Sequence, residues 1–271
     1  MIFSPGSGGS FTNYNWFIEE LLGAGYAVAT LDHPGNSARN NTTEGIVRVW
    51  DRPGDISLVL DSLQKHRAWS ERIDFDRVGV AGHSSGGYTA IALAGALYDF
   101  EAMAAYCSGV DRGPDCDLVY STAEIDYSDA GSSNKDDRFK SVFAMAPAVG
   151  PGVTTSSLEA IDIPVYIIST EDDELLGLEH HAYHYANHIP DAQLELIPSG
   201  GHFLFVECSL VTRIANWFIE EFDLCGSQFN IDRDSARQDI ARQAVIFFDR
   251  TIGEYRSNNT SKGDVQMGGS S

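Results

Sequence analysis

Residues 82–86 read Gly-His-Ser-Ser-Gly and fit the pattern G-x-S-x-G, with Ser84 at its centre. An apolar run at 78–81 precedes the pattern, and an alanine- and leucine-rich run at 88–97 follows it. A strand, a sharp turn and a helix in this order expose a nucleophilic serine above a sheet, with glycines where strand and helix pass closely. A Gly/Ser-rich loop can match the pattern by chance, so the flanking elements favour Ser84 as a nucleophile.

A serine hydroxyl is a weak nucleophile at neutral pH, so it needs a general base that is itself oriented by a carboxylate. We expect His202 to be the base. It follows an apolar run at 194–197 and the pair Gly200 and Gly201, which lets the backbone turn sharply. An isolated histidine is usually a satisfied surface residue, but its position after the last expected strand favours the catalytic role.

The acidic run Glu-Asp-Asp-Glu at 171–174 follows a β-branched run at 165–169 and is expected to supply the carboxylate. Asp173 is the first candidate, because it lies a few residues beyond the strand and just before an apolar pair. Asp172 is the second candidate and Glu171 the third. Because one carboxylate suffices, we expect at least two of the four to be solvated.

An acyl-transfer site also needs two backbone N–H groups that face the developing oxyanion. Ser85, directly after the nucleophile, is expected to give one, and Ser7, in the glycine-rich loop at 5–10, the other. A phosphate-binding loop is the alternative for residues 5–10, but the segment has neither the lysine of a Walker A motif nor the spacing of a dinucleotide fingerprint.

The composition excludes several other functions. With 271 residues, 43% hydrophobic and 21% charged, the chain is long enough for a full-sized core. The formal net charge of −21 argues against nucleic acid or an anionic membrane surface as a partner. No apolar run is long enough to span a membrane.

His180, His184 and His188 would share one helical face, but a packed or solvated face is a better interpretation than a metal site. His83 is expected to pack locally, and His33 to lie in a turn.

The four cysteines form two sequence-local pairs, Cys107 with Cys116 and Cys208 with Cys225, and neither pair has C-x-x-C spacing. The spacing therefore disfavours zinc. It leaves open whether the four residues form two local disulfides, as an oxidising compartment would allow, or remain buried thiols.

Strand-like and helix-like segments alternate along the chain, which predicts an α/β fold with a mostly parallel sheet and helices on both faces. An acidic segment at 99–140 loses periodicity and is expected to be an insert or lid. One domain is predicted over residues 1–256, with a disordered Gly/Ser/Asn-rich tail at 257–271. Expected strands are 2–4, 26–31, 75–81, 142–146, 163–169 and 193–197, and expected helices are 13–22, 53–63, 88–97, 178–188, 208–222 and 235–255.

Three segments together resemble the α/β-hydrolases described as predicted dienelactone hydrolases: Gly-His-Ser-Ser-Gly-Gly at 82–87, Asp-His-Pro-Gly-Asn at 32–36 and Gly-Gly-His-Phe-Leu-Phe at 200–205. These proteins are similar to platelet-activating-factor acetylhydrolases and to cutinase-like polyester hydrolases. The segments Asp-Arg-Pro-Gly-Asp-Ile at 51–56 and Phe-Phe-Asp-Arg at 247–250 fit the same pattern, so the resemblance covers nearly all of residues 1–255.

The resemblance implies an α/β-hydrolase fold and a serine carboxylester hydrolase with a Ser84–His202–Asp173 triad. It also implies oxyanion donors at Ser7 and Ser85. Such an enzyme needs no metal or organic cofactor and acts, we expect as a monomer, on a small-molecule or polymeric ester. An amidase or peptidase with the same triad is one alternative, and an inactive binding protein with this fold is another. Many relatives are exported and disulfide-bonded, which favours the disulfides Cys107–Cys116 and Cys208–Cys225.

The chain departs from the resembling family in two respects. True dienelactone hydrolases have a cysteine nucleophile where this chain has Ser84, so their name does not define the substrate here. The family's first strands precede the loop at 4–9, where this chain begins. We therefore expect a sheet that lacks these strands, and a longer natural protein whose upstream signal segment would direct it to a secreted or periplasmic location.

Overall fold

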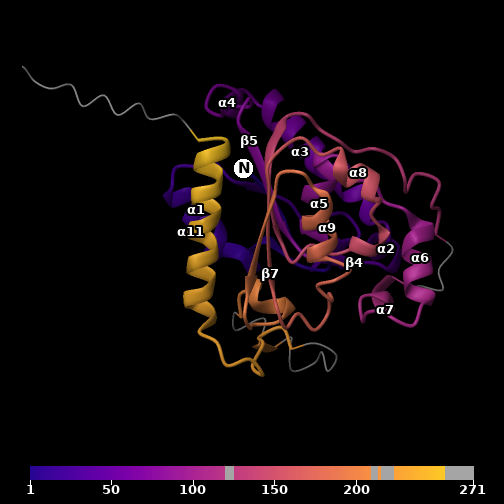
Figure 1. Cartoon of the computed structure of the whole chain (residues 1–271). Helices are drawn as coiled ribbons and strands as arrows, with labels where there is room; N and C mark the ends of the chain where they lie inside the picture. The colour runs from indigo at the N-terminus through magenta and orange to yellow at the C-terminus, as the bar shows by residue number, and fades with distance from the viewer. Residues whose placement is uncertain (120–124, 209–212, 215–222, 254–271) are drawn as a thin grey trace, which may run out of the picture.

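The computed structural model describes residues 1–119, 125–208, 213–214 and 223–253 (Figure 1). The tail predicted at 257–271 and most of the helix expected at 208–222 lie outside these ranges. Within them, six parallel strands form one sheet in the order β2-β1-β5-β6-β7-β8. The strands are β1 (Ile2–Ser4), β2 (Ala29–Thr30), β5 (Val78–His83), β6 (Phe139–Met145), β7 (Val165–Thr170) and β8 (Ala192–Ile197). A small antiparallel pair, β3 (Asn36–Ser37) and β4 (Asn40–Asn41), lies apart from this sheet.

Helices cover both faces of the sheet, as predicted. The α-helices are α1 (Asn15–Gly23), α2 (Thr43–Val47), α3 (Arg52–Lys65), α4 (Arg67–Ser70), α5 (Ser85–Ala94), α6 (Phe100–Ser108), α7 (Cys116–Val119), α8 (Thr155–Glu159), α9 (Ala182–His188) and α11 (Arg233–Thr251). Short 3-10 helices are η1 (Phe11–Tyr14), η2 (Val49–Asp51), η3 (Gly150–Gly152) and η4 (His202–Phe205). In Figure 1, α1 and α11 lie on one side of the sheet, and α3, α5 and α9 on the other.

The alternation of side chains along buried strands builds a core on each face. On β6, Val142 and Ala144 contribute to the core beneath α3, α5 and α9. Phe143 and Met145 point to the opposite face and pack in the core beneath α1 and α11. Because both faces are buried, most of the strands read as nearly continuous apolar runs.

The second strand is shorter than predicted. The apolar run at 26–31 indicated a buried strand, but only Ala29 and Thr30 pair with β1, and both are half-buried. The pairing with β1 extends over only two residues, Ile2 and Phe3. A strand is defined by its backbone hydrogen bonds to a neighbouring strand and not by its own hydrophobicity. The short pairing with β1 therefore limits the length of β2.

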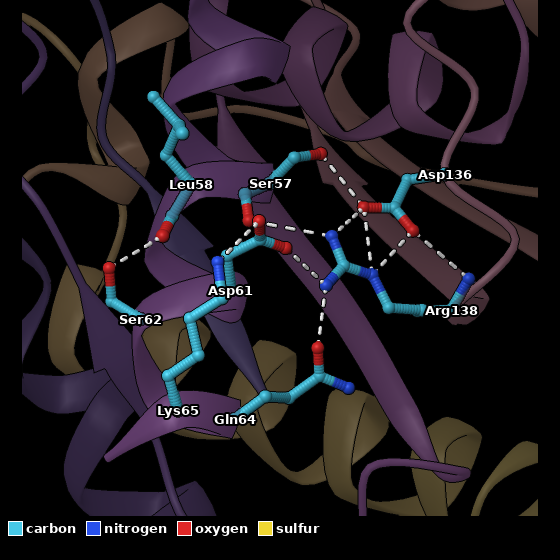
Figure 2. Close-up of polar contacts among 8 residues, drawn as sticks. All are labelled: Ser57, Leu58, Asp61, Ser62, Gln64, Lys65, Asp136 and Arg138. Carbon is cyan, nitrogen blue, oxygen red and sulfur yellow. Dashed lines mark hydrogen bonds and ion pairs between the residues drawn. The ribbon is translucent and has the colours of Figure 1, made fainter.

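Arg138 joins α3 to the segment that leads into β6 (Figure 2). Its guanidinium donates to Asp61 (2.7 Å) and Gln64 (2.8 Å) of α3 and to Asp136 (2.8 Å). Ser57 of the same helix donates to Asp136 at 2.8 Å. These contacts fix α3 against the sheet, which matters because the first turn of α3 carries residues that reach the candidate site.

The described part of the segment at 99–140 contains two short helices, α6 and α7. Asp99 caps α6 by accepting from the Ala102 N–H, and its own N–H donates to the Gly152 carbonyl at 2.7 Å. The buried Met103 packs in the core that lies beneath α3, α5 and α9. Asp115, beside α7, lies 3.3 Å from His181 near the start of α9. The part of the insert that the structure describes is therefore docked on the domain, and its role as a lid remains a prediction.

Both predicted cysteine pairs are at bonding distance, Cys107 with Cys116 and Cys208 with Cys225. Closing a loop across the nine-residue separation of Cys107 and Cys116 restricts the unfolded chain and should stabilise the fold by about 3 kcal/mol. Replacing both residues with serine is expected to lower the free energy of unfolding by that amount in urea titrations. If the double variant and the oxidised wild type unfold at the same urea concentration, this stabilisation is absent.

Candidate active site

Ser84 lies at the junction of β5 and α5 in a strained backbone conformation, with φ 56° and ψ −121°. Its N–H donates to the Met145 carbonyl at 2.9 Å. A Cβ at Gly82 would overlap the Gly86 carbonyl, and one at Gly86 would overlap the carbonyls of residues 4 and 5. Both glycines are therefore required by close backbone approach, as the sequence pattern indicated. The turn leaves Ser84 half-buried between buried neighbours.

The structure brings Asp173 and His202 together from the ends of β7 and β8. Asp173 Oδ2 lies 2.9 Å from His202 Nδ1, and each side chain is 1% exposed. Asp173 Oδ1 accepts from the N–H groups of Leu175 (3.0 Å) and Leu176 (2.7 Å). Because a carboxylate only accepts, the Nδ1 of His202 carries the proton and its Nε2 is left as the basic nitrogen. The pair therefore has the orientation that a general base requires.

The pKa of Asp173 reflects two opposing effects. Burial alone would raise the pKa of this carboxyl group, but the nearby charge of His202 and the hydrogen bonds from His202, Leu176 and Leu175 outweigh burial and hold the pKa below its usual range. Asp173 is thus ionised at neutral pH, where it can stabilise a protonated imidazole.

The ring of His202 lies close to the turn between β5 and α5 that bears Ser84. Its centroid is 4.8 Å from that of His83, the residue before Ser84, and His83 Nε2 donates to the His202 carbonyl at 3.1 Å. Among the described residues, no hydrogen bond joins Ser84 Oγ to the His202 ring. In sites without substrate this contact is often long and shortens in the complex.

Two carboxylates of the acidic run, Asp172 and Glu174, also hold the turn that precedes His202. Asp172 accepts from Ser199 Oγ (2.6 Å) and from the N–H groups of Gly200 and Gly201 (both 2.9 Å). Glu174 accepts from the His202 N–H at 2.8 Å. Glu171 and Glu174 are exposed, in line with the expectation that at least two of the four would be solvated, but Asp172, Asp173 and Glu174 also accept hydrogen bonds from the segment at 199–202. That segment needs partners since it turns through two glycines with φ of 143° and 66°.

The two residues predicted to supply oxyanion donors, Ser85 and Ser7, both lie near Ser84. Ser85 is the first residue of α5, so its N–H has no acceptor within the helix and points from the positive end of the helix dipole. Ser7 is an exposed residue in the loop after β1. A Cβ built on the neighbouring Gly6 would lie 3.4 Å from the Cβ of Ser84, so this loop passes directly beside Ser84.

His83 does more than pack locally. Its Nε2 donates to the His202 carbonyl, so its Nδ1 is the acceptor for the Tyr14 hydroxyl at 2.9 Å. Burial, reinforced by the nearby charge of His202, holds the pKa of His83 well below its usual value and keeps the ring neutral. No local pattern indicates this contact, because Tyr14 lies 69 residues away from His83.

The turn at residues 32–36 also contributes to a buried polar network. His33 is 2% exposed, with Nε2 2.9 Å from Ser4 Oγ and Nδ1 2.8 Å from Asp55 Oδ2. Arg52, also 2% exposed, donates hydrogen bonds to Ser4 and Asn36 in the same network. The sequence pattern indicates a turn at His33 and no role for Arg52. The resembling segments at 32–36 and 51–56 contain these residues, but no spacing rule pairs them.

His33 should make the stability of the fold depend on pH. Burial, and then the charge of Arg52, lower the pKa of His33 from 6.5 to about 4. The unfolded chain therefore binds a proton near pH 6.5 that the folded chain refuses until about pH 4, so stability falls as the pH decreases through this interval. The contribution of His33 is about 3 kcal/mol over the whole interval.

Urea unfolding at several pH values between about 4.5 and about 7 measures this contribution. His33→Gln is the comparison variant, since it removes the titrating ring and leaves His83 in place. We expect the unfolding free energy of the variant to fall less steeply with decreasing pH, by up to about 1.4 kcal/mol per pH unit. Parallel pH dependences in the two proteins would show that His33 titrates normally in the fold.

The remaining histidines do not assemble the metal site considered above. His180 precedes α9 rather than sharing its face, while His184 Nε2 contacts the Val153 carbonyl at 3.0 Å and His188 Nδ1 the His184 carbonyl at 2.7 Å. The described ranges contain no group of three or more His, Cys, Asp or Glu side chains arranged to hold a metal. In the same ranges, no helix has the length and apolar character needed to cross a membrane.

Comparisons with known proteins agree with this architecture. Residues 1–211 match the model of the alpha/beta hydrolase family. A segment of 89 residues is 34% identical to 2-hydroxy-6-oxononadienedioate/2-hydroxy-6-oxononatrienedioate hydrolase 1 of Pseudomonas putida, covering 33% of this chain and 27% of that protein. A ferulic acid esterase from Streptomyces cinnamoneus has a similar structure, with a TM-score of 0.60 and 20% identity over 93% of this chain and 66% of the esterase. The chain belongs to the alpha/beta hydrolase family.

Proposed function

We propose that this protein hydrolyses carboxylic esters through an acyl-enzyme formed on Ser84. The observation that carries the proposal is the buried Asp173–His202 pair, which lies beside the strained turn bearing Ser84. The structural likeness to a ferulic acid esterase, a protein that acts on an ester by its name, supports the same reaction class.

In the acylation step, His202 Nε2 takes the proton of the Ser84 hydroxyl as the oxygen attacks the ester carbonyl carbon. The negative charge on the carbonyl oxygen is stabilised by the backbone N–H groups of Ser85 and Ser7. His202, now an imidazolium held by the Asp173 carboxylate, donates its proton to the leaving alcohol as the C–O bond breaks. Ser84 is then esterified by the acyl group.

In the deacylation step, water takes the place of the alcohol. His202 Nε2 accepts a proton from the water molecule, whose oxygen attacks the acyl carbon, and the same N–H groups stabilise the second tetrahedral intermediate. The proton returns to Ser84 Oγ as the carboxylic acid leaves. Each proton in this sequence moves between the His202 ring, Ser84 and the reactants, and no step draws on a metal or an organic cofactor.

Pre-steady-state hydrolysis of p-nitrophenyl acetate and p-nitrophenyl butyrate tests the proposal. Alcohol release precedes deacylation, and for these activated esters we expect deacylation to be the slower step, so a burst of p-nitrophenol approaching one equivalent per chain should be followed by slower turnover. Matched acyl p-nitroanilides distinguish the alternatives. Faster turnover of the anilides would indicate an amidase or peptidase, and folded protein that gives neither burst nor turnover with either series would be a binding protein.

A further inference from the structure

Arg52, at the first position of α3, is a charged residue buried in the core at 2% exposure. Burial lowers the pKa of its guanidinium to about 10, which still leaves it positively charged at neutral pH. The acceptors that the structure gives it are neutral: Thr89 Oγ1 (3.1 Å), Asn36 Oδ1 (2.5 Å), Ser4 Oγ (3.4 Å) and the Pro5 carbonyl. A buried cation is costly, and an apolar side chain would fill the space with less loss of hydration, so its contacts call for a functional explanation.

The contact with Pro5 acts on the backbone beside the nucleophile. Arg52 Nη2 donates to the Pro5 carbonyl, and the N–H of the same peptide unit, on Gly6, donates to the Tyr14 hydroxyl at 3.1 Å. Because a peptide unit is planar, holding both its oxygen and its N–H fixes its orientation. The next peptide unit, which carries the Ser7 N–H, starts from this fixed plane.

A second series of contacts reaches Ser7 itself. Asn36 Oδ1 accepts from Arg52, and Asn36 Nδ2 donates to Ser7 Oγ at 2.8 Å. One guanidinium therefore holds residues 5–7 directly through Pro5 and indirectly through Asn36. The planar fork of arginine, unlike the single charge of lysine, can satisfy acceptors in several directions at once.

We propose that Arg52 is a positioning residue for the hydrolytic reaction, holding the loop at 5–7 so that the Ser7 N–H faces the oxyanion. This inference rests on the proposed function. A preorganised donor needs no reorientation as charge develops, so it stabilises the transition state more than the bound substrate. Disturbing Arg52 should therefore lower kcat and leave KM nearly unchanged.

The test compares Arg52→Lys, Asn36→Ala and Ser7→Ala with the wild type. The last variant removes the Asn36 contact and keeps the backbone N–H. Each protein is titrated by its p-nitrophenol burst, so that kcat is expressed per active site. Inhibition by an alkyl trifluoromethyl ketone, which forms a tetrahedral oxyanion on the serine, reports donor placement directly. Ser141→Ala serves as the control, because Ser141 is buried and accepts a hydrogen bond from Thr251 away from the site.

Removing one oxyanion donor costs about 100- to 1,000-fold in kcat, so misplacing one should cost less. We expect kcat per site to fall about 30-fold in Arg52→Lys, about 10-fold in Asn36→Ala and about 3-fold in Ser7→Ala, with KM within about 2-fold and ketone affinity weakened in proportion. Variants that lower only the titratable fraction, with kcat per site and ketone affinity unchanged, would overturn the inference.

Two further outcomes are also decisive. If Arg52→Lys does not fold, as judged by circular dichroism, the two other variants decide, and an unchanged kcat per site in both overturns the inference. A folded wild type that gives neither a burst nor turnover overturns the proposed function and this inference with it. A normal wild-type burst with unaffected variants overturns the inference alone.

Discussion

Ser84→Ala is expected to lower kcat/KM for p-nitrophenyl esters by about 10,000-fold or more, because the variant has no oxygen to form the acyl-enzyme. The loss should appear as both an absent burst and a slow steady state. Residual turnover above the uncatalysed rate is expected, since the N–H groups of Ser7 and Ser85 can still stabilise an oxyanion formed by water.

The fold of the variant should be unaffected. Alanine keeps the Cβ and the same backbone, and Ser84 Oγ has no hydrogen bond among the described residues, so the urea midpoint should stay close to that of the wild type. Ser141→Ala, in a buried strand away from the turn, is expected to keep full activity and serves as the serine-to-alanine control. Full activity of Ser84→Ala would exclude Ser84 as the nucleophile.

Asp173→Asn is expected to lower kcat by about 1,000- to 10,000-fold while preserving the fold. Asparagine can keep its oxygen on the Leu175 and Leu176 N–H groups, which Asp173 Oδ1 now binds. Its NH₂ would then face His202 Nδ1 and stabilise the tautomer with the proton on Nε2. That tautomer cannot accept the Ser84 proton, so the ring would be in place but unable to act as a base.

Asp172→Asn is the matched control, since the two residues are adjacent and the chemical change is the same. Its oxygen can keep both glycine N–H contacts, and its NH₂ can donate to Ser199 Oγ, which reverses only that hydrogen bond. We expect kcat within about 5-fold of the wild type. A large loss in Asp172→Asn with a small loss in Asp173→Asn would make Asp172 the triad acid. Steady-state kinetics on burst-titrated protein separates the two outcomes.

The sequence predicted the parts of the site that depend on local rules. A serine between a buried strand and a helix, flanked by glycines, is constrained by sterics alone, and the structure has the strained φ of 56° at Ser84 that this predicts. Asp173 and His202 could be proposed because both follow parallel strands, whose carboxyl ends lie at one edge of a sheet. Their 2.9 Å contact agrees with that reasoning, and their catalytic roles remain predictions.

The supporting contacts could not be predicted in the same way. Arg52 reaches residues that are 16, 37 and 47 positions away, and nothing in their types or spacing indicates a common location. The acidic run is a second case: propensity places Asp172 and Glu174 in a loop, but it does not identify them as the acceptors for the N–H groups of the glycine turn and of His202. Such pairings depend on tertiary packing, which local patterns do not contain.

Labelling with a fluorophosphonate, followed by peptide mass spectrometry, tests the central claim most directly. The reagent phosphonylates a serine only when a base activates it and oxyanion donors stabilise the addition. We predict one adduct per folded chain, on Ser84, which disappears in Ser84→Ala and forms far more slowly in Asp173→Asn. An adduct on Ser85 or Ser7, or no adduct on folded wild-type protein, would contradict the assignment of Ser84 as an activated nucleophile.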